Sequence, residues 1–281
     1  MKNIIISGLA AIPMILSTLV PSVSRAQSEK GIIEKYFQKL TTVPVGNIVH
    51  KYRMTAVYTN KDLYGNFTGK MKVTGEYTKG IENGLVHWNH IFISNSSNYA
   101  EPFPAGTKQE YMENLTYVPS PKMLAAESFK NFPATTDAVF ARNLVWDMMA
   151  IENFAWDFTD SLKLNKTYRI SQNNRAFNMA DIGTYAHNEI QICWTGISAM
   201  NDELCAVLEY RALDNKIELS MDGFKTKGTE QYWGTTWVSL KTRSVEAAVM
   251  YSGTIQEIDI RGMKDKLLVK TIREIQVEKI Q

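Results

Sequence analysis

The residues of this chain that are best spaced for chemistry are aromatic. Trp233 and Trp237 lie four positions apart in a segment that alternates like a β-strand, so both indoles point to one face, about 13 Å apart at a rise of ~3.3 Å per residue. Tyr232 points to the opposite face. Two indoles placed in this way can stack on a sugar or line a cavity for an apolar ligand. We therefore expect Trp233, Trp237 and Tyr232 to bind a ligand.

Two further tryptophans can complete such a site. Trp194 stands before a Thr-Gly pair, and Trp88 lies in the middle of another predicted strand. If the indoles converge, the sheet encloses an aromatic-walled pocket. The alternative is an ordinary core in which each indole N–H finds one partner. The sequence leaves both alternatives open, so Trp88 and Trp194 join the candidate ligand-binding residues.

The sequence lacks the signatures of several large enzyme classes, among them Gly-x-Ser-x-Gly, Gly-x-x-x-x-Gly-Lys, Gly-x-Gly-x-x-Gly and His-Glu-x-x-His. His87 and His90 are three apart, which on a strand turns the imidazoles to opposite faces, so the pair cannot share a metal ion. His187 and Glu189 share a face and can act as acid and base only in a cleft. We expect no metal and no cofactor, and we assign no catalytic residue.

Cys193 and Cys205 are the two cysteines of the chain. In an oxidising compartment a disulfide between them is the natural expectation. The bond requires both side chains to share a face, which an odd number of loop residues allows and a two-residue turn at Asn201 and Asp202 forbids. The sequence leaves a disulfide and two buried thiols as alternatives.

The first 26 residues have the pattern of a secretory signal peptide. Lys2 gives the positive start, residues 4–20 are apolar, and Ser-Arg-Ala at 24–26 offers small residues for cleavage before Gln27. The apolar run contains a proline and is shorter than the ~20 residues of a membrane-spanning helix. We expect a soluble protein exported to the periplasm or the extracellular space, with no integral membrane span after cleavage.

The composition is that of a globular protein. The 281 residues are 44% hydrophobic and 21% charged, which excludes a wholly disordered chain, a collagen and a coiled coil. Lys and Arg number 31 against 29 Asp and Glu, and without residues 1–26 the two balance at 29 each. Because nucleic-acid affinity depends on clustered Lys and Arg, and no basic run is present, we expect no nucleic-acid partner.

The elements that must position these residues are mainly β-strands. Residues 28–40 have the apolar spacing of a short amphipathic helix, and the period then changes to two. An Asn-Gly pair at 83–84 and short turns at 222–223 and 261–262 indicate antiparallel hairpins. The alternation predicts strands at 52–58, 70–77, 85–93, 110–118, 167–171, 187–197, 204–212, 216–221, 228–241, 245–260 and 266–280.

A central helix is predicted at 136–153, where apolar residues recur at helical spacing from Phe140 to Ile151, with Thr135 or Thr136 as its cap. Residues 94–133 before it contain five prolines and break the pattern, as long binding loops do.

These elements predict a mainly β protein, with a curved antiparallel sheet or half-barrel of about ten strands closed by the N-terminal amphipathic helix and the central helix. After the signal peptide, residues 27–281 form a single β-rich domain, or two half-sheets, 45–133 and 160–281, joined by a helical segment at 134–158.

The first function that fits is non-enzymatic binding of a hydrophobic or lipid-like small molecule in the cavity of the sheet. Burying acyl surface contributes about 25 cal/mol per Å² and requires few polar groups. In outline this architecture resembles the half-barrel carriers of the bacterial periplasm and the lipocalin-like barrels, although no motif of either family matches. A sheet with both faces filled by its own side chains would exclude this function.

Two other classes remain. A glycan-binding or glycan-degrading module would use the face of Trp233 and Trp237 as a platform, with Asp157 and Asp160 on one helical face flanking a glycosidic bond. A structural or interaction protein would meet its partner through exposed strand edges or through residues 94–133.

Overall fold

The structure of the chain, a computed structural model, describes residues 31, 35, 48–81, 84–156, 162–171 and 176–280. The predicted signal peptide lies outside the described residues. So does the predicted N-terminal helix at 28–40, except for Gly31 and Lys35, which are helical.

The described residues form thirteen strands and a long helix, α2 (Thr136–Trp156). Three short 3₁₀ helices precede α2: η2 (Glu110–Met112), η3 (Pro121–Leu124) and η4 (Ala126–Phe129). The strands are β1 (His50–Asp62), β2 (Phe67–Ile81), β3 (Leu85–Ser96), β4 (Thr107–Lys108), β5 (Leu115–Tyr117), β6 (Thr167–Ser171), β7 (Ala176–Asn178), β8 (Gly183–Ala186), β9 (Glu189–Met200), β10 (Glu203–Met221), β11 (Phe224–Ser239), β12 (Val245–Ile260) and β13 (Leu267–Ile280).

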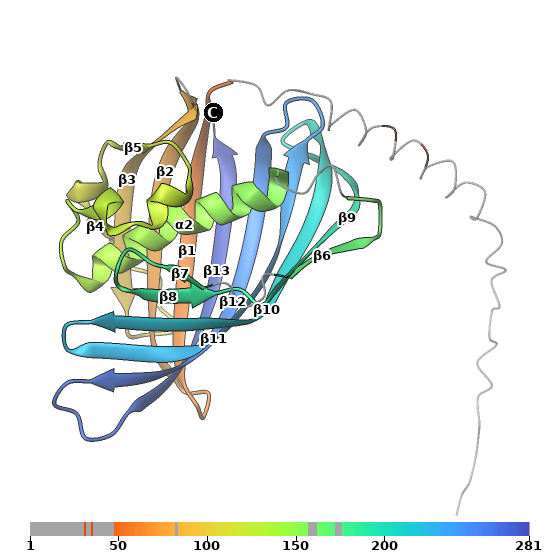
Figure 1. The fold of residues 1–281 in the computed structure, drawn as a ribbon. Helices are drawn as coiled ribbons and strands as arrows, with labels where there is room; N and C mark the ends of the chain where they lie inside the picture. The colour runs from red at the N-terminus through yellow and green to blue at the C-terminus, as the bar shows by residue number, and fades with distance from the viewer. Residues whose placement is uncertain are drawn as a thin grey trace, which may run out of the picture.

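All thirteen strands belong to one antiparallel sheet that curves around α2 and does not close (Figure 1). The main path runs β4-β3-β2-β1-β13-β12-β11-β10-β8-β7, while β5 pairs with β3, and β9 lies between β10 and β6. The predicted curved antiparallel sheet with a central helix is therefore confirmed. Its strands number thirteen rather than about ten, because the short strands β4, β7 and β8 carry too few residues for a visible alternation.

The first and last strands join the two parts of the chain. β1 pairs with β13 along its length, from Lys51 opposite Ile280 to Asp62 opposite Val269. This pairing joins the strands before and after α2 in one sheet.

A bulge in β3 corrects one sequence expectation. Trp88 and Ile91 are three residues apart, so strict alternation along the predicted strand would place them on opposite faces, but both are fully buried. His90 has a φ of 56°, its N–H donates to Glu113 Oε1 at 2.7 Å, and the register with β2 shifts between Thr74 and Glu76. The extra residue moves the following side chains to the other face, as a bulge does.

The turn between β9 and β10 determines where Cys193 and Cys205 lie along the hairpin. Asn201 and Asp202 form a two-residue turn with φ of 51° and 61°, as a type I′ hairpin requires. Cys193 is paired with Glu209 and Cys205 with Ser198, several positions apart along the hairpin. The disulfide expected from the compartment is therefore not formed, and both cysteines are free thiols.

The segment between β3 and α2 also differs from the prediction. The strand expected at 110–118 consists of η2 followed by the three-residue strand β5. Conversely, the strands expected at 204–212 and 216–221 are one long strand, β10, with an irregularity between Ala212 and Asn215.

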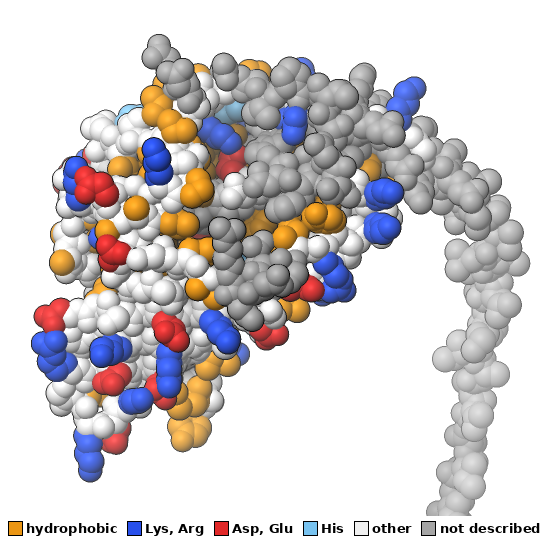
Figure 2. Space-filling view, viewed as in Figure 1, with side chains coloured by type: hydrophobic (Ala, Val, Ile, Leu, Met, Phe, Trp, Pro, Cys, Tyr) orange, Lys and Arg blue, Asp and Glu red, His pale blue; other side chains and the backbone are white. Residues whose placement is uncertain are grey.

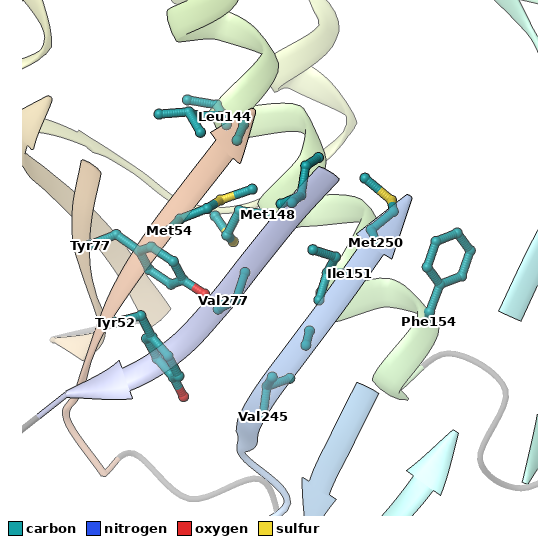
Figure 3. Close-up of a cluster of buried hydrophobic side chains, with 14 of the residues drawn as sticks. Tyr52, Met54, Tyr77, Leu144, Met148, Ile151, Phe154, Val245, Met250 and Val277 are labelled. Carbon is teal, nitrogen blue, oxygen red and sulfur yellow. The ribbon is translucent and has the colours of Figure 1, made fainter. Parts of the chain in front are cut away.

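Helix α2 crosses the concave face of the sheet (Figure 1). The Thr135 hydroxyl accepts a hydrogen bond from the Ala138 N–H at 3.4 Å, which fits its predicted role as the cap. Leu144, Met148 and Ile151 are fully buried, and in Figure 3 they point to side chains of the sheet. We call the face of the sheet that α2 covers the inner face, and the opposite face the outer face.

Candidate functional site

The sequence-predicted aromatic residues are divided between the two faces of the sheet. Trp88, Trp194 and Tyr232 are buried on the inner face. The indole N–H of Trp88 donates to the Tyr117 hydroxyl at 3.0 Å, and that of Trp194 donates to the Gly196 carbonyl at 2.8 Å. Each of these indoles thus has the single polar partner of a core tryptophan.

Trp233 and Trp237 lie on the outer face. Trp233 is 47% exposed and stacks on Tyr251 of β12, with ring centroids 6.0 Å apart and ring planes 25° apart. Trp237 is half-buried and is opposite Val207 and Ala247. The five predicted residues therefore do not surround one pocket.

Tyr232 belongs to an aromatic cluster between α2 and the strands β8, β10 and β11. Phe154 of α2 stacks on Tyr210, with ring centroids 4.3 Å apart. The ring centroid of Tyr232 lies 5.9 Å from that of Phe154 and 5.8 Å from that of His187. Tyr185 is 5.0 Å from His187. The rings contact one another, so the cluster packs the end of α2 against the sheet.

The other predicted polar candidates are not assembled into a catalytic pair. His187 makes a contact of 3.2 Å with Asn215 Oδ1, and burial lowers the pKa of its imidazole. Glu189 instead accepts hydrogen bonds from Arg169 and Gln191 on the surface. Asp157 and Asp160 lie outside the described residues.

Among the described residues, a large cluster of buried hydrophobic side chains lies on the inner face beneath α2. Its floor combines aromatic, aliphatic and methionine side chains from β1, β2, β12 and β13, which Leu144, Met148, Ile151 and Phe154 of α2 cover (Figure 3). The labelled floor residues are Tyr52, Met54, Tyr77, Val245, Met250 and Val277. Methionine is unbranched and polarizable, so such a floor can adapt to differently shaped partners.

A charged cluster interrupts this apolar layer. Arg273 of β13 donates from Nη1 to both carboxylate oxygens of Asp147 on α2, at 3.1 and 3.0 Å. Its Nη2 donates to Glu230 of β11 at 3.3 Å, and its Nε to the Ser252 hydroxyl at 3.1 Å. The Tyr185 hydroxyl donates to the other oxygen of Glu230 at 2.6 Å. We call these five residues the Arg273 cluster.

The cluster holds one more negative than positive charge in a nearly dry environment. The side chains of Arg273, Asp147 and Glu230 are at most 12% exposed. Burial outweighs the attraction of Arg273 and raises the pKa of Asp147 to about 6. Burial opposes the charge of Arg273, but the facing carboxylates of Asp147 and Glu230 raise its pKa overall, so the guanidinium stays charged.

Sequence reasoning missed the Arg273 cluster, although its signal is present in the alternation. Arg273 shares the face of β13 with Ile275 and Val277, and Glu230 precedes Tyr232 by two positions on β11. Asp147 follows Leu144 by one helical turn. A charged residue in the apolar register of its element is the pattern that identifies such a site.

The surface at the lower end of the sheet is of mixed character. In Figure 2 positive and negative side chains lie close to one another there, and a group of hydrophobic side chains lies at its lower right. Ion pairs such as Lys266 with Glu257, at 2.7 Å, belong to this region, and in the turn between β1 and β2 the side chain of Tyr64 is exposed. No group of three or more His, Cys, Asp or Glu within the described residues is placed to hold a metal ion. Nor does any described helix have the length and hydropathy of a membrane span.

Comparisons with known proteins give only distant likenesses. No family model and no curated protein matches the chain. Among solved structures, one of lipovitellin that concerns lipid–protein interactions is 11% identical, with a TM-score of 0.43; the match covers 83% of this chain and 25% of that one. A protein of the DUF1329 family from Desulfovibrio piger is 8% identical with a TM-score of 0.16, and the match covers 88% and 92% of the two chains. This chain thus spans a quarter of the lipovitellin chain. No function is transferred at such scores.

Proposed function

We propose that this protein is an exported, non-enzymatic carrier that binds a hydrophobic or lipid-like small molecule between the inner face of its sheet and α2. The observation that carries the proposal is the construction of the core: within the described residues, one long helix covers the apolar concave face of a thirteen-stranded sheet. Trp88 of β3, Trp194 of β9 and Tyr232 of β11 belong to the same buried cluster and lie on the strands beside the floor.

The chemistry of the floor suits an acyl chain. Met54, Tyr77, Met250 and Val277 are buried in one hydrophobic cluster with the side chains of α2, and an acyl chain buries surface of the same kind at about 25 cal/mol per Å². A ligand that replaced α2 on the floor would therefore recover much of the burial that the helix provides.

The sheet itself does not depend on α2 for its hydrogen bonds. β1, β13, β12 and β11 pair with one another in unbroken antiparallel ladders over most of their lengths. The outer face of these strands carries exposed side chains such as Trp233 and Ile255. Within the described residues the inner face is covered by α2 of the same chain, and we propose that this helix moves aside when the ligand binds.

Native mass spectrometry of the protein purified from the cells that make it tests the proposal. We expect a folded protein with a mass excess that disappears after denaturation and solvent extraction, and the extract then identifies the ligand. A folded protein with no excess mass, which also fails to bind oleyl alcohol in titration, would overturn the proposal.

A second candidate function is glycan binding at the outer face. Trp233 is about half exposed and is stacked on Tyr251, and the two rings give a flat aromatic platform of the kind on which sugars stack. A Trp233→Ala variant that binds a glycan as tightly as the parent would remove the support for this alternative. The matched control is Trp237→Ala on the same face.

A further inference from the structure

We propose that the ligand is an acidic amphiphile, a long-chain carboxylate, and that its head group binds Arg273 in the place that Asp147 occupies when α2 covers the floor. This inference rests on the proposed function, because it names the ligand class of the same site. It makes Asp147 an internal substitute for the ligand's carboxylate.

The geometry of Arg273 is that of a carboxylate-binding site. Nη1 is shared by the two oxygens of Asp147, while Nη2 and Nε are held by Glu230 and Ser252. The partners from β11 and β12 fix the guanidinium plane on the sheet. The guanidinium N–H groups of Arg273 that face α2 are therefore held in a fixed orientation. A planar guanidinium recognises a carboxylate better than any other side chain does.

The position of Arg273 suits the head of an amphiphile. Ile275 and Val277 follow it on the same face of β13, and Val277 is about 13 Å away at ~3.3 Å per residue. Ile275 is flanked by Ala56 of β1 and Met250 of β12. A chain whose carboxylate reached Arg273 would thus lie along the apolar floor from which α2 had withdrawn.

The hydrogen bonds that Arg273 Nη1 donates to Asp147 give the selectivity. When α2 moves aside, Asp147 leaves with it, and Arg273 keeps Glu230 as its charged partner. An incoming carboxylate restores the original set of contacts. An alcohol or an ester offers Nη1 only a neutral acceptor, and hydrogen bonds between two charged groups are stronger than those to a neutral acceptor. The site should therefore prefer anionic ligands to neutral ligands of the same chain length.

Titration of the full chain with oleate, oleyl alcohol and methyl oleate at pH 8 tests the inference. We expect oleate to bind at least about tenfold more tightly than the alcohol and the ester, since a hydrogen bond to a charged group is worth about 1.5–3 kcal/mol. Arg273→Met should remove this preference. The control is Arg53→Met, which lies on the outer face and should keep the preference.

Asp147→Asn provides a second test that does not depend on the folding of the arginine variant. The substitution removes the carboxylate that competes with the ligand for Arg273, so oleate should bind the Asp147→Asn variant more tightly than it binds the parent. Equal binding of oleate and oleyl alcohol to the parent would overturn the inference and leave the carrier proposal standing. Failure of all three ligands to bind would overturn both.

Discussion

The guanidinium of Arg273 on the last strand holds the carboxylate of Asp147 in the middle of α2 by two hydrogen bonds of 3.1 and 3.0 Å. This contact ties the helix to the floor of the sheet across an otherwise apolar layer. A second ion pair, between Lys79 of β2 and Glu152, ties the C-terminal half of the helix. The fixed polar groups thus determine where α2 sits, while the apolar contacts determine how tightly it packs.

The first prediction concerns pH. The pKa of Asp147 in the folded protein is about 6, above that of an unfolded aspartate, so the folded state binds the extra proton between about pH 4 and pH 6. The contribution of the Asp147 carboxyl to the unfolding free energy should therefore fall as the pH rises from about 4 to about 6, and it should stay constant at higher pH. Chemical denaturation measures the unfolding free energies of the parent and of Asp147→Asn. The difference between the two values should change by about 2 kcal/mol between pH 4 and pH 7. A constant difference would contradict the assignment.

The second prediction concerns the loss of the cation. Arg273→Met leaves Asp147 and Glu230 buried without their shared counter-charge, which should cost about 3–5 kcal/mol of unfolding free energy at pH 7. The cost should be smaller at pH 5, where Asp147 is protonated. Arg53→Met, which breaks only exposed ion pairs, should cost less than about 1 kcal/mol. Urea denaturation at both pH values measures these effects.

The third prediction concerns a glycine under the aromatic cluster. A Cβ at Gly234 would lie 2.2 Å from the Val249 carbonyl oxygen and 2.5 Å from the Tyr210 hydroxyl, so Gly234→Ala should cost about 1–3 kcal/mol. Because Tyr210 stacks on Phe154, the near-UV circular dichroism should change as well. Gly253→Ala is the control, since nothing lies within 4 Å of its added Cβ, and it should change stability by less than about 0.5 kcal/mol. Equal effects of the two variants would contradict this reading of the packing.

The long strands and the central helix could be predicted from the sequence because their side chains repeat with one period over many residues. β12 has the predicted bounds, and α2 begins at the predicted Thr136. The bulge at His90 could not be predicted, because its cause is a contact with Glu113 in a segment that alternation does not describe. Strict alternation along β3 would therefore exchange the inner and outer faces beyond that bulge.

The candidate site was less predictable than the fold. Each of the aromatic residues was assigned to a face by its own strand, but the sequence does not say which face the helix covers. Trp233 was for this reason grouped with Trp194, which lies on the other side of the sheet. The ion pair between Arg273 and Asp147 joins residues 126 positions apart, and only the tertiary structure brings them together.

The fourth prediction concerns the thiols. Cys205 is fully buried, and burial together with nearby carboxylates raises its pKa to about 12, whereas Cys193 is half-buried. Since the thiolate is the reactive form, iodoacetamide should label Cys193 well before Cys205 in the native protein at pH 8. Peptide mass spectrometry after timed labelling measures both rates. Labelling that begins only after treatment with a reductant would show that the two cysteines are bonded.

The fifth prediction tests whether the contact between α2 and the floor is the binding site. Met148 is fully buried and faces the floor beside Met54 and Val277 (Figure 3). Met148→Ala should lower the unfolding free energy by about 2–5 kcal/mol and leave an apolar cavity beneath the helix. It should also bind oleyl alcohol more tightly, because the helix then covers the floor less well and competes less with the ligand. Asn153→Ala, at an exposed position of α2, is the matched control and should change neither quantity. If Met148→Ala were destabilised without any gain in binding, the ligand would not compete with α2, and the site would have to be sought elsewhere on the molecule.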